Sequence, residues 1–147
     1  MSGGLQIGAV IKARATLDRF QEFESKITGP ELAGPLKLAG IAVQNSIRDE
    51  LGKKQHKKGT PTNSEPGEPP SLVTGSLRRS IQVGEPAPKG FGSWYVQVGP
   101  TMNYSRVQEL GGGKSNLPAR PYVAPGFDRS RPEVRRILSE YWERATR

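Results

Sequence analysis

The chain has 147 residues, of which 33% are hydrophobic and 24% charged, and its formal net charge is +8. This length fits one domain with a core of modest size. The absence of cysteine excludes disulfides, thiolate metal sites and a cysteine nucleophile. No apolar run approaches the roughly 20 residues of a transmembrane helix. Because Met1–Gly4 lacks the basic and apolar regions of a signal peptide, we expect a soluble protein made in the cytoplasm.

The positive charge is concentrated in the middle and the C-terminal half of the chain. Residues 1–51 carry six bases and six acids, residues 52–79 carry six and two, and residues 80–147 carry ten and six. Such an excess favours a polyanionic neighbour, of which DNA is the obvious candidate. The same charge could equally serve only to keep the protein soluble, and charge alone does not separate the two interpretations.

The N-terminal part predicts a short strand and then a short helix. Residues 5–11 alternate partly between apolar and polar side chains, which is typical of a strand. Within residues 18–27, Phe20, Phe23 and Ile27 lie three and four positions apart. This spacing predicts a short amphipathic helix.

The clearest element is a long helix that ends at Leu51 and is followed by the terminator Gly52. Pro30 suits a first helical turn, where its missing N–H costs nothing. Gly34 and Pro35 delay the regular helix until after Pro35. A single apolar stripe recurs at steps of three or four residues along about five turns. Its members are Leu32, Leu36, Ala39, Val43, Ile47 and Leu51.

Residues 52–73 differ in composition from the rest of the chain. They begin with the basic run Lys53-Lys54-Gln55-His56-Lys57-Lys58, and residues 59–70 contain four prolines and two glycines but hardly an apolar side chain. Such a segment cannot contribute to a core, so it predicts a long exposed loop. A loop of this length in a small domain is usually functional or ordered by a partner.

Beyond the loop, the sequence predicts a β-hairpin. Residues 80–84 and 93–99 both alternate between apolar and polar side chains, as strands do, with Trp94, Val96 and Val98 on one face of the second. Residues 85–92 are rich in Pro and Gly and form the predicted turn region. The chain then predicts a short helix at 103–110, closed by Gly111–Gly113, and an extended segment at 118–123.

The end of the chain predicts a second amphipathic helix. Arg131-Pro132-Glu133 marks its start, with proline again in the first turn. An apolar stripe follows at i, i+3, i+4, i+7 and i+8. It consists of Val134, Ile137, Leu138, Tyr141 and Trp142. We therefore expect a single domain over 1–147, with the strand and helices in 4–51, the exposed loop in 52–73, and the hairpin, short helix and C-terminal helix in 74–147.

The sequence offers little for catalysis. His56 is the only histidine and lies within the lysine run, whereas a catalytic base or metal ligand needs fixed geometry and an orienting partner. Ser71, Ser76 and Ser80 have no other histidine to act as their base. The glycines at 111–113 with Lys114 lack the spacing and preceding strand of a phosphate loop. We expect no enzyme, cofactor or metal.

Residues 66–81, 98–111 and 118–127, taken in this order, resemble segments of the neck and tail-completion proteins of long-tailed double-stranded DNA phages. Residues 66–81, PGEPPSLVTGSLRRSI, are similar to that family's "G-x-P-P … (R/V)-T-G-x-L-R-x-S-I" core. Residues 98–100 and 104–111, VGP and YSRVQELG, resemble its "VG … YA-x-x-x-E-x-G" stretch. Residues 118–127, PARPYVAPGF, resemble "P-A-R-P-F-(L/V)-x-P-A". Leu110 and Tyr122 stand where Phe is commoner, and the Lys-rich insert is not a shared feature.

The resemblance implies an α+β fold, with a small antiparallel sheet packed against a long helix. It also implies a homo-oligomeric ring, with a hexamer as the expected form, at the head–tail junction of the virion, assembled in the host cytoplasm. The implied neighbours are head-closure or adaptor proteins, tail terminator or tail tube proteins, and genomic double-stranded DNA in the lumen, bound non-specifically. A tail terminator that caps the tube, and a stand-alone basic nucleic-acid-binding protein, are the alternatives.

Two groups of residues are candidate contact sites in this interpretation. The basic group could face the DNA channel or a partner, although the lysine run alone is more simply a solvated loop, and no sequence-reading DNA motif is visible. The aromatic group could line a subunit interface or belong to an ordinary core. The basic candidates are Lys53, Lys54, Lys57, Lys58, Arg78, Arg79 and Arg120. The aromatic candidates are Trp94, Tyr104, Tyr122, Tyr141 and Trp142.

Overall fold

A computed structural model describes residues 29–53, 64–70, 75–90, 92–114 and 116–147. The strand expected at 5–11 and the helix expected at 18–27 lie outside these residues. So do Lys54, Lys57 and Lys58 of the basic run.

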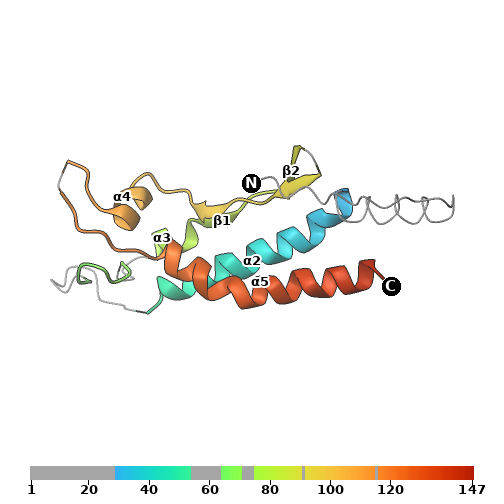
Figure 1. Ribbon diagram of the computed structural model, residues 1–147. Helices are drawn as coiled ribbons and strands as arrows, with labels where there is room; N and C mark the ends of the chain where they lie inside the picture. The colour runs from blue at the N-terminus through green and yellow to red at the C-terminus, as the bar shows by residue number, and fades with distance from the viewer. Residues whose placement is uncertain (1–28, 54–63, 71–74, 91, 115) are drawn as a thin grey trace, which may run out of the picture.

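Two long helices form one layer of the fold. Helix α2 (Ala33–Glu50) follows the short 3-10 turn η1 (Pro30–Leu32), and helix α5 (Val123–Ala145) runs antiparallel beside it (Figure 1). The predicted stripe of the first helix is confirmed, because Ala39, Val43, Ile47 and Leu51 are buried. Regular helix begins at Ala33 rather than after Pro35, because a proline in the first turn has no intrahelical N–H bond to lose.

The predicted hairpin is present as two short, successive ladders. Strand β1 (Ile81–Val83) pairs antiparallel with β4 (Val98–Pro100), and β2 (Ala87–Gly90) pairs antiparallel with β3 (Ser93–Tyr95). The second predicted strand is therefore interrupted between Tyr95 and Val98. The region expected to be a turn contains β2, because only the tip beyond Gly90 is needed to reverse the chain. The burial of Trp94, Val96 and Val98 alternates with exposed neighbours, as expected.

Strands β1 and β4 lie against α2, which places the ladder and the helices around one core. The amide of Gln44 and the guanidinium of Arg48, both on α2, donate to the carbonyl of Ile81 at 2.7 and 3.0 Å. The core consists of Val43, Ile47, Leu51, Ile81 and Tyr122, with Leu77, Val98, Val123 and Val134 packed around it. The chain is thus α+β, with small antiparallel ladders and a long C-terminal helix.

The start of the last helix was predicted wrongly. Helix α5 begins at Val123, eight residues before Arg131, and Pro132 lies inside it. Pro132 cannot donate the hydrogen bond that an interior residue gives to the carbonyl four residues earlier, so it weakens the helix without ending it. Pro125 is the proline that lies in the first turn. The short helix α4 (Ser105–Leu110) was predicted, whereas the single turn α3 (Ser76–Arg79) was not.

The close approach of α5 to α2 depends on Gly126. A Cβ atom at this position would lie 2.6 Å from the Cα of Ile47 and 2.9 Å from its amide nitrogen. These are backbone atoms, which cannot rotate away as a flexible side chain could. Any side chain at position 126 therefore forces the two helices apart.

We predict that Gly126→Ala lowers the free energy of unfolding by about 1–3 kcal/mol, because it overpacks the contact between the helices. Urea denaturation followed by circular dichroism measures this loss. The control is Gly99→Ala, because no atom lies within 4 Å of the added Cβ and the substitution should change stability by no more than about 0.5 kcal/mol. Equal effects of the two substitutions would contradict the helix contact.

Candidate functional site

The three segments that resemble the phage family meet at one end of the molecule, around α3, α4 and the first turn of α5 (Figure 1). The amide of Gly67 donates to the carbonyl of Ala119 at 2.9 Å, which joins the first segment to the third. The amide of Arg120 donates to the carbonyl of Gln108 at 2.7 Å, which joins the third to the second. The β1–β4 ladder joins the second to the first. Segments far apart in sequence thus form one framework.

Glu109 is the central side chain of this framework. One of its carboxylate oxygens accepts the amides of Tyr122 and Val123 at 2.7 and 2.9 Å, and the other accepts the amide of Ala124 at 3.0 Å. These are amides of the N-terminal turn of α5, which have no intrahelical acceptors. A carboxylate at this end also interacts favourably with the helix dipole. The cap explains why α5 begins at Val123, although Tyr122 is not a capping residue type.

Two glycines of the resembling segments are required by backbone geometry. Gly111, which ends α4, has a φ of 73°, and a Cβ there would lie 2.7 Å from the amide nitrogen of Ala119. Gly75, before α3, has a φ of 71° in the left-handed region. Glycine adopts this conformation without the steric cost that other residues pay. Both positions therefore contribute to the framework through their backbone conformation.

Tyr122 lies in the core and not at a surface. Its side chain is 0% exposed, and its hydroxyl donates to the carbonyl of Ser105 at 3.4 Å. Burial, together with the nearby charge of Glu109, raises the pKa of the Tyr122 phenol to about 12. Of the two alternatives for this residue, an ordinary core or a subunit interface, its complete burial in the described conformation agrees with the core.

Part of the basic group gathers at the C-terminal end of α2, where the helix dipole favours cations. Lys53 binds the carboxylate of Glu50 at 2.6 Å, and Arg129 on α5 binds the same carboxylate. Because Glu50 is only 1% exposed, its charge is buried, and Lys53 and Arg129 compensate it. The Nε of Arg78 donates to the carbonyl of Arg48 at 3.0 Å. Arg129 was not among the basic candidates from the sequence, because its partner Glu50 is 79 positions away.

The remaining basic candidates have different surroundings. Arg79 is exposed on α3, and its guanidinium contacts the hydroxyl of Ser76 at 3.5 Å. Arg120 is half-buried, and its Nε has no hydrogen-bond partner among the described residues. The structure therefore brings Lys53 and Arg78 together at one helix end but does not place Arg120 in the same cluster.

The aromatic candidates other than Tyr122 reach the surface. Tyr104 and Trp142 are exposed, and Trp94 and Tyr141 are half-buried. The rings of Tyr141 and Trp142 contact each other at 5.7 Å between centroids. Two further exposed apolar residues, Leu110 and Phe127, were not among the contact candidates named from the sequence. They are 66% and 49% exposed and line one hollow of about 460 Å³ between α4 and α5.

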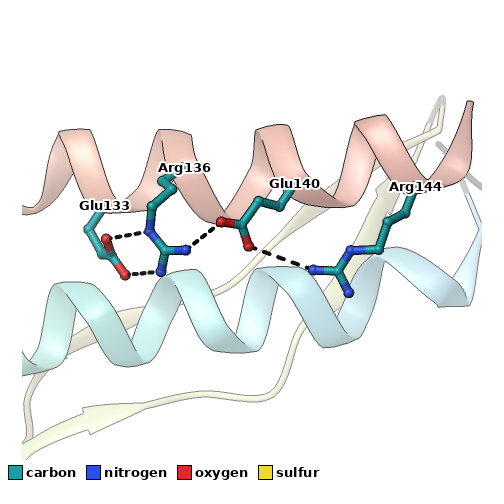
Figure 2. A network of polar contacts seen from close by, with 4 residues as sticks. All are labelled: Glu133, Arg136, Glu140 and Arg144. Atoms are coloured by element: carbon teal, nitrogen blue, oxygen red, sulfur yellow. Dashed lines mark hydrogen bonds and ion pairs between the residues drawn. The ribbon is translucent and has the colours of Figure 1, made fainter.

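A ladder of ion pairs runs along α5. Arg136 binds Glu133 at 2.6 Å and Glu140 at 2.5 Å, and Arg144 binds Glu140 at 3.6 Å (Figure 2). The hydrogen bond from Arg136 lowers the pKa of Glu133. Because these side chains are exposed, the ladder adds little stability, as is usual for i,i+3 and i,i+4 pairs on a helix surface.

Neither a metal cluster nor a membrane span is found in the part of the chain that the structure describes. No three acidic or histidine side chains there are grouped so that they could hold a metal ion. None of the described helices is both long and apolar enough to cross a membrane. Comparison of the chain with known protein families, with curated proteins and with solved structures found no match.

We predict that Glu109→Gln destabilises the protein by about 1–2 kcal/mol, because the amide keeps only one acceptor oxygen and loses the charge at the helix N-terminus. Chemical denaturation at neutral pH measures this change. Glu143→Gln is the matched control, since Glu143 is exposed near the other end of α5. A loss no larger than that of the control would show that the carboxylate does not hold the start of the helix.

Because the pKa of Tyr122 is raised, we predict that the protein loses stability at high pH. In the folded protein the pKa of Tyr122 lies above the ordinary value of 10. The buried neutral phenol therefore contributes fully to the free energy of unfolding below pH 10, and this contribution is lost as the pH rises toward 12. The loss is on the order of 2 kcal/mol. Urea denaturation between pH 8 and 11.5 should show this extra decline in the wild type and not in Tyr122→Phe. Parallel curves for the two proteins would rule out the titration of this phenol as the cause.

Proposed function

We propose that this chain is a structural subunit of the neck of a long-tailed double-stranded DNA phage. In this proposal several copies form a ring, a hexamer by the resemblance, around the DNA channel and join tail to head. A closely related alternative is that the same kind of subunit serves as the tail terminator, which would cap the tail tube. The proposed neighbours are head-closure or adaptor proteins and tail terminator or tail tube proteins.

The observation that carries the proposal is the framework at one end of the molecule. Residues shared with the family pattern are spread over about 60 positions, yet they contact one another. Glu109 caps α5, Gly75 and Gly111 have positive φ angles, and the carbonyl of Ala119 accepts the amide of Gly67. Each of these residues helps to hold the fold. A shared architecture would explain why the resembling sequence positions are the ones with structural roles, and this supports the proposal.

The acidic side chains support a structural role rather than a catalytic one. Glu50 is paired with two cations, Glu109 is used as a helix cap, and Glu133 and Glu140 pair with Arg136. A general acid or base must be free to exchange its proton with a substrate. We propose that the protein is not an enzyme.

Exposed apolar side chains around α4 supply a surface for contact between subunits. Leu110 and Phe127 line the same hollow, with the apolar side chain of Val123 beside them. Apolar side chains gathered in one exposed place are typical of an interaction surface. A ring needs two different surfaces on each subunit, because its contacts are head-to-tail. We propose that this hollow belongs to one of them.

The stand-alone nucleic-acid-binding protein remains the competing proposal, and the exposed cations Arg78 and Arg79 on α3 favour it. In that case the monomer itself binds DNA, and the logarithm of the binding constant falls linearly with the logarithm of salt concentration. In the neck proposal the same cations face a lumen that exists only in the assembled ring.

We predict that light scattering of the purified protein, at low and high salt, gives a ring mass, which for a hexamer of this 16.0 kDa chain is about 96 kDa. A monomer that forms rings only when mixed with neck or tail proteins of the same phage also agrees with the proposal. The double substitution Leu110→Ser with Phe127→Ser should reduce the ring mass while the thermal unfolding temperature stays nearly unchanged, because both side chains are exposed.

Tyr95→Ser is the control, since it removes an exposed aromatic ring from the hairpin, away from α4 (Figure 1). A monomer that ignores neck and tail proteins and binds DNA tightly would contradict the neck proposal and favour the stand-alone alternative. Intact rings in the double variant would leave the neck proposal standing and exclude the hollow from the interface.

A further inference from the structure

The proposed ring needs a second contact surface on each subunit, different from the hollow between α4 and α5. The hollow encloses about 460 Å³, and its lining includes the apolar side chains of Pro100, Leu110, Val123 and Phe127. A concave apolar surface of this kind is complemented by apolar side chains that project from a neighbouring molecule. The second surface must therefore present exposed apolar side chains that lie outside the hollow.

Helix α2 presents such side chains on the side that the core does not use. Leu38 is 57% exposed, the largest fraction among the large apolar side chains described outside the hollow, and Ile41 is 38% exposed. They lie three residues apart, so they project from one face of the helix. A surface helix normally has one apolar stripe, and that of α2 is already buried through Ala39, Val43 and Ile47. Leu38 and Ile41 form an additional pair, here called the α2 face, which borders a groove between α2 and α5.

The hollow and the α2 face lie apart along the pair of long helices (Figure 1). Gly126, the neighbour of Phe127, lies against the backbone of Ile47, so the hollow is level with the C-terminal half of α2. Leu38 lies nine residues before Ile47, which is about 14 Å along the helix axis. Because the two surfaces are separate, one subunit can use both at the same time, one toward each neighbour, as a closed ring requires.

The charges beside the two surfaces are complementary. Asp49 is exposed and lines the same groove as the α2 face, whereas Arg106 is exposed and lines the hollow. Lys37, the base of α2 in this groove, is engaged with Glu85 of the hairpin at 2.5 Å. The bases of α5 in the groove are each paired with an acid of the same chain, and these bases are Arg129, Arg136 and Arg144. An acid thus remains beside the α2 face, and a base beside the hollow.

We infer that the α2 face of one copy docks in the hollow of the next copy, head to tail around the ring. Leu38 and Ile41 then enter the hollow, and Asp49 lies near Arg106 at its edge. This arrangement has the apolar centre and polar rim that are usual for interfaces between proteins. A second copy is the occupant, because the chain itself supplies both an apolar hollow beside a base and an apolar face beside an acid. The inference rests on the proposed ring and adds to it the second surface of each subunit.

Two double variants test this pairing by complementation. Leu38→Gln with Ile41→Gln alters the α2 face, and Leu110→Ser with Phe127→Ser alters the hollow. Each variant alone should lose the ring mass in light scattering, because every contact then has one defective side. An equimolar mixture should give a dimer of about 32 kDa, twice the 16.0 kDa of one chain, because one contact with two intact sides is possible. Circular dichroism and the thermal unfolding temperature show whether each variant is folded.

Disulfide formation between copies tests the same contact even if a double variant does not fold. The chain has no native cysteine, so each introduced thiol is the only one. A mixture of Leu38→Cys chains and Phe127→Cys chains should form a disulfide-linked dimer on mild oxidation severalfold faster than either variant alone. Tyr95→Cys in place of Leu38→Cys is the matched control, because Tyr95 is exposed on the hairpin. Its mixture with Phe127→Cys should show only the slow rate of random encounter.

The outcomes separate this inference from the neck proposal. An intact ring in Leu38→Gln with Ile41→Gln would overturn the inference and leave the ring standing, and it would show that the hollow does not receive the α2 face. Equal cross-linking rates for the Leu38→Cys and Tyr95→Cys mixtures would overturn it as well, even in a wild type that assembles only with neck or tail proteins. A wild type that forms no ring, gives no cross-link in the mixture of variants and ignores those proteins would overturn both proposals.

Discussion

The described fold depends on one carboxylate. Glu109 lies on the six-residue helix α4 and accepts the first amides of α5, so the start of the longest helix is decided by a side chain from a different element. The same contact brings Tyr122 into the core, where it meets Ile47 and Ile81. Because a charged acceptor satisfies three otherwise unpaired donors, α5 needs no local capping residue.

Helix α5 is then held against α2 by two features of opposite character. Gly126 removes a side chain, so that the backbones approach closely, and Arg129 supplies a cation to the buried carboxylate of Glu50. An unpaired carboxylate at that depth would be costly, and Lys53 and Arg129 compensate it. The charge at the end of α2 thus has a structural role first. Any contact with DNA would have to use cations that remain exposed, among them Arg79.

These constraints also shape the functional interpretation. The residues of the family-like segments hold caps, tight turns and close contacts. Glu50, Glu109, Glu133 and Glu140 are engaged with cations or amides. What the framework leaves unused is surface: the hollow beside Leu110 and Phe127, and the groove between α2 and α5. A protein whose family-like residues serve the fold and whose surface exposes apolar side chains such as Leu110 and Phe127 is suited to assembly, which agrees with the proposed role in a phage neck.

The sequence by itself determined the elements whose signals are local. The apolar stripe predicted the helix that ends near Leu51, and strand alternation predicted the hairpin, because periodicity reports which face is buried. Only the tertiary structure decided where α5 begins, that Tyr122 is core rather than interface, and that Arg129 pairs with Glu50. Each of these features depends on a partner that is distant in sequence. The cap by Glu109 outweighs the local helix-start signal at Pro132, and contacts between distant residues cannot be inferred from spacing along the chain, because they form only when the chain folds.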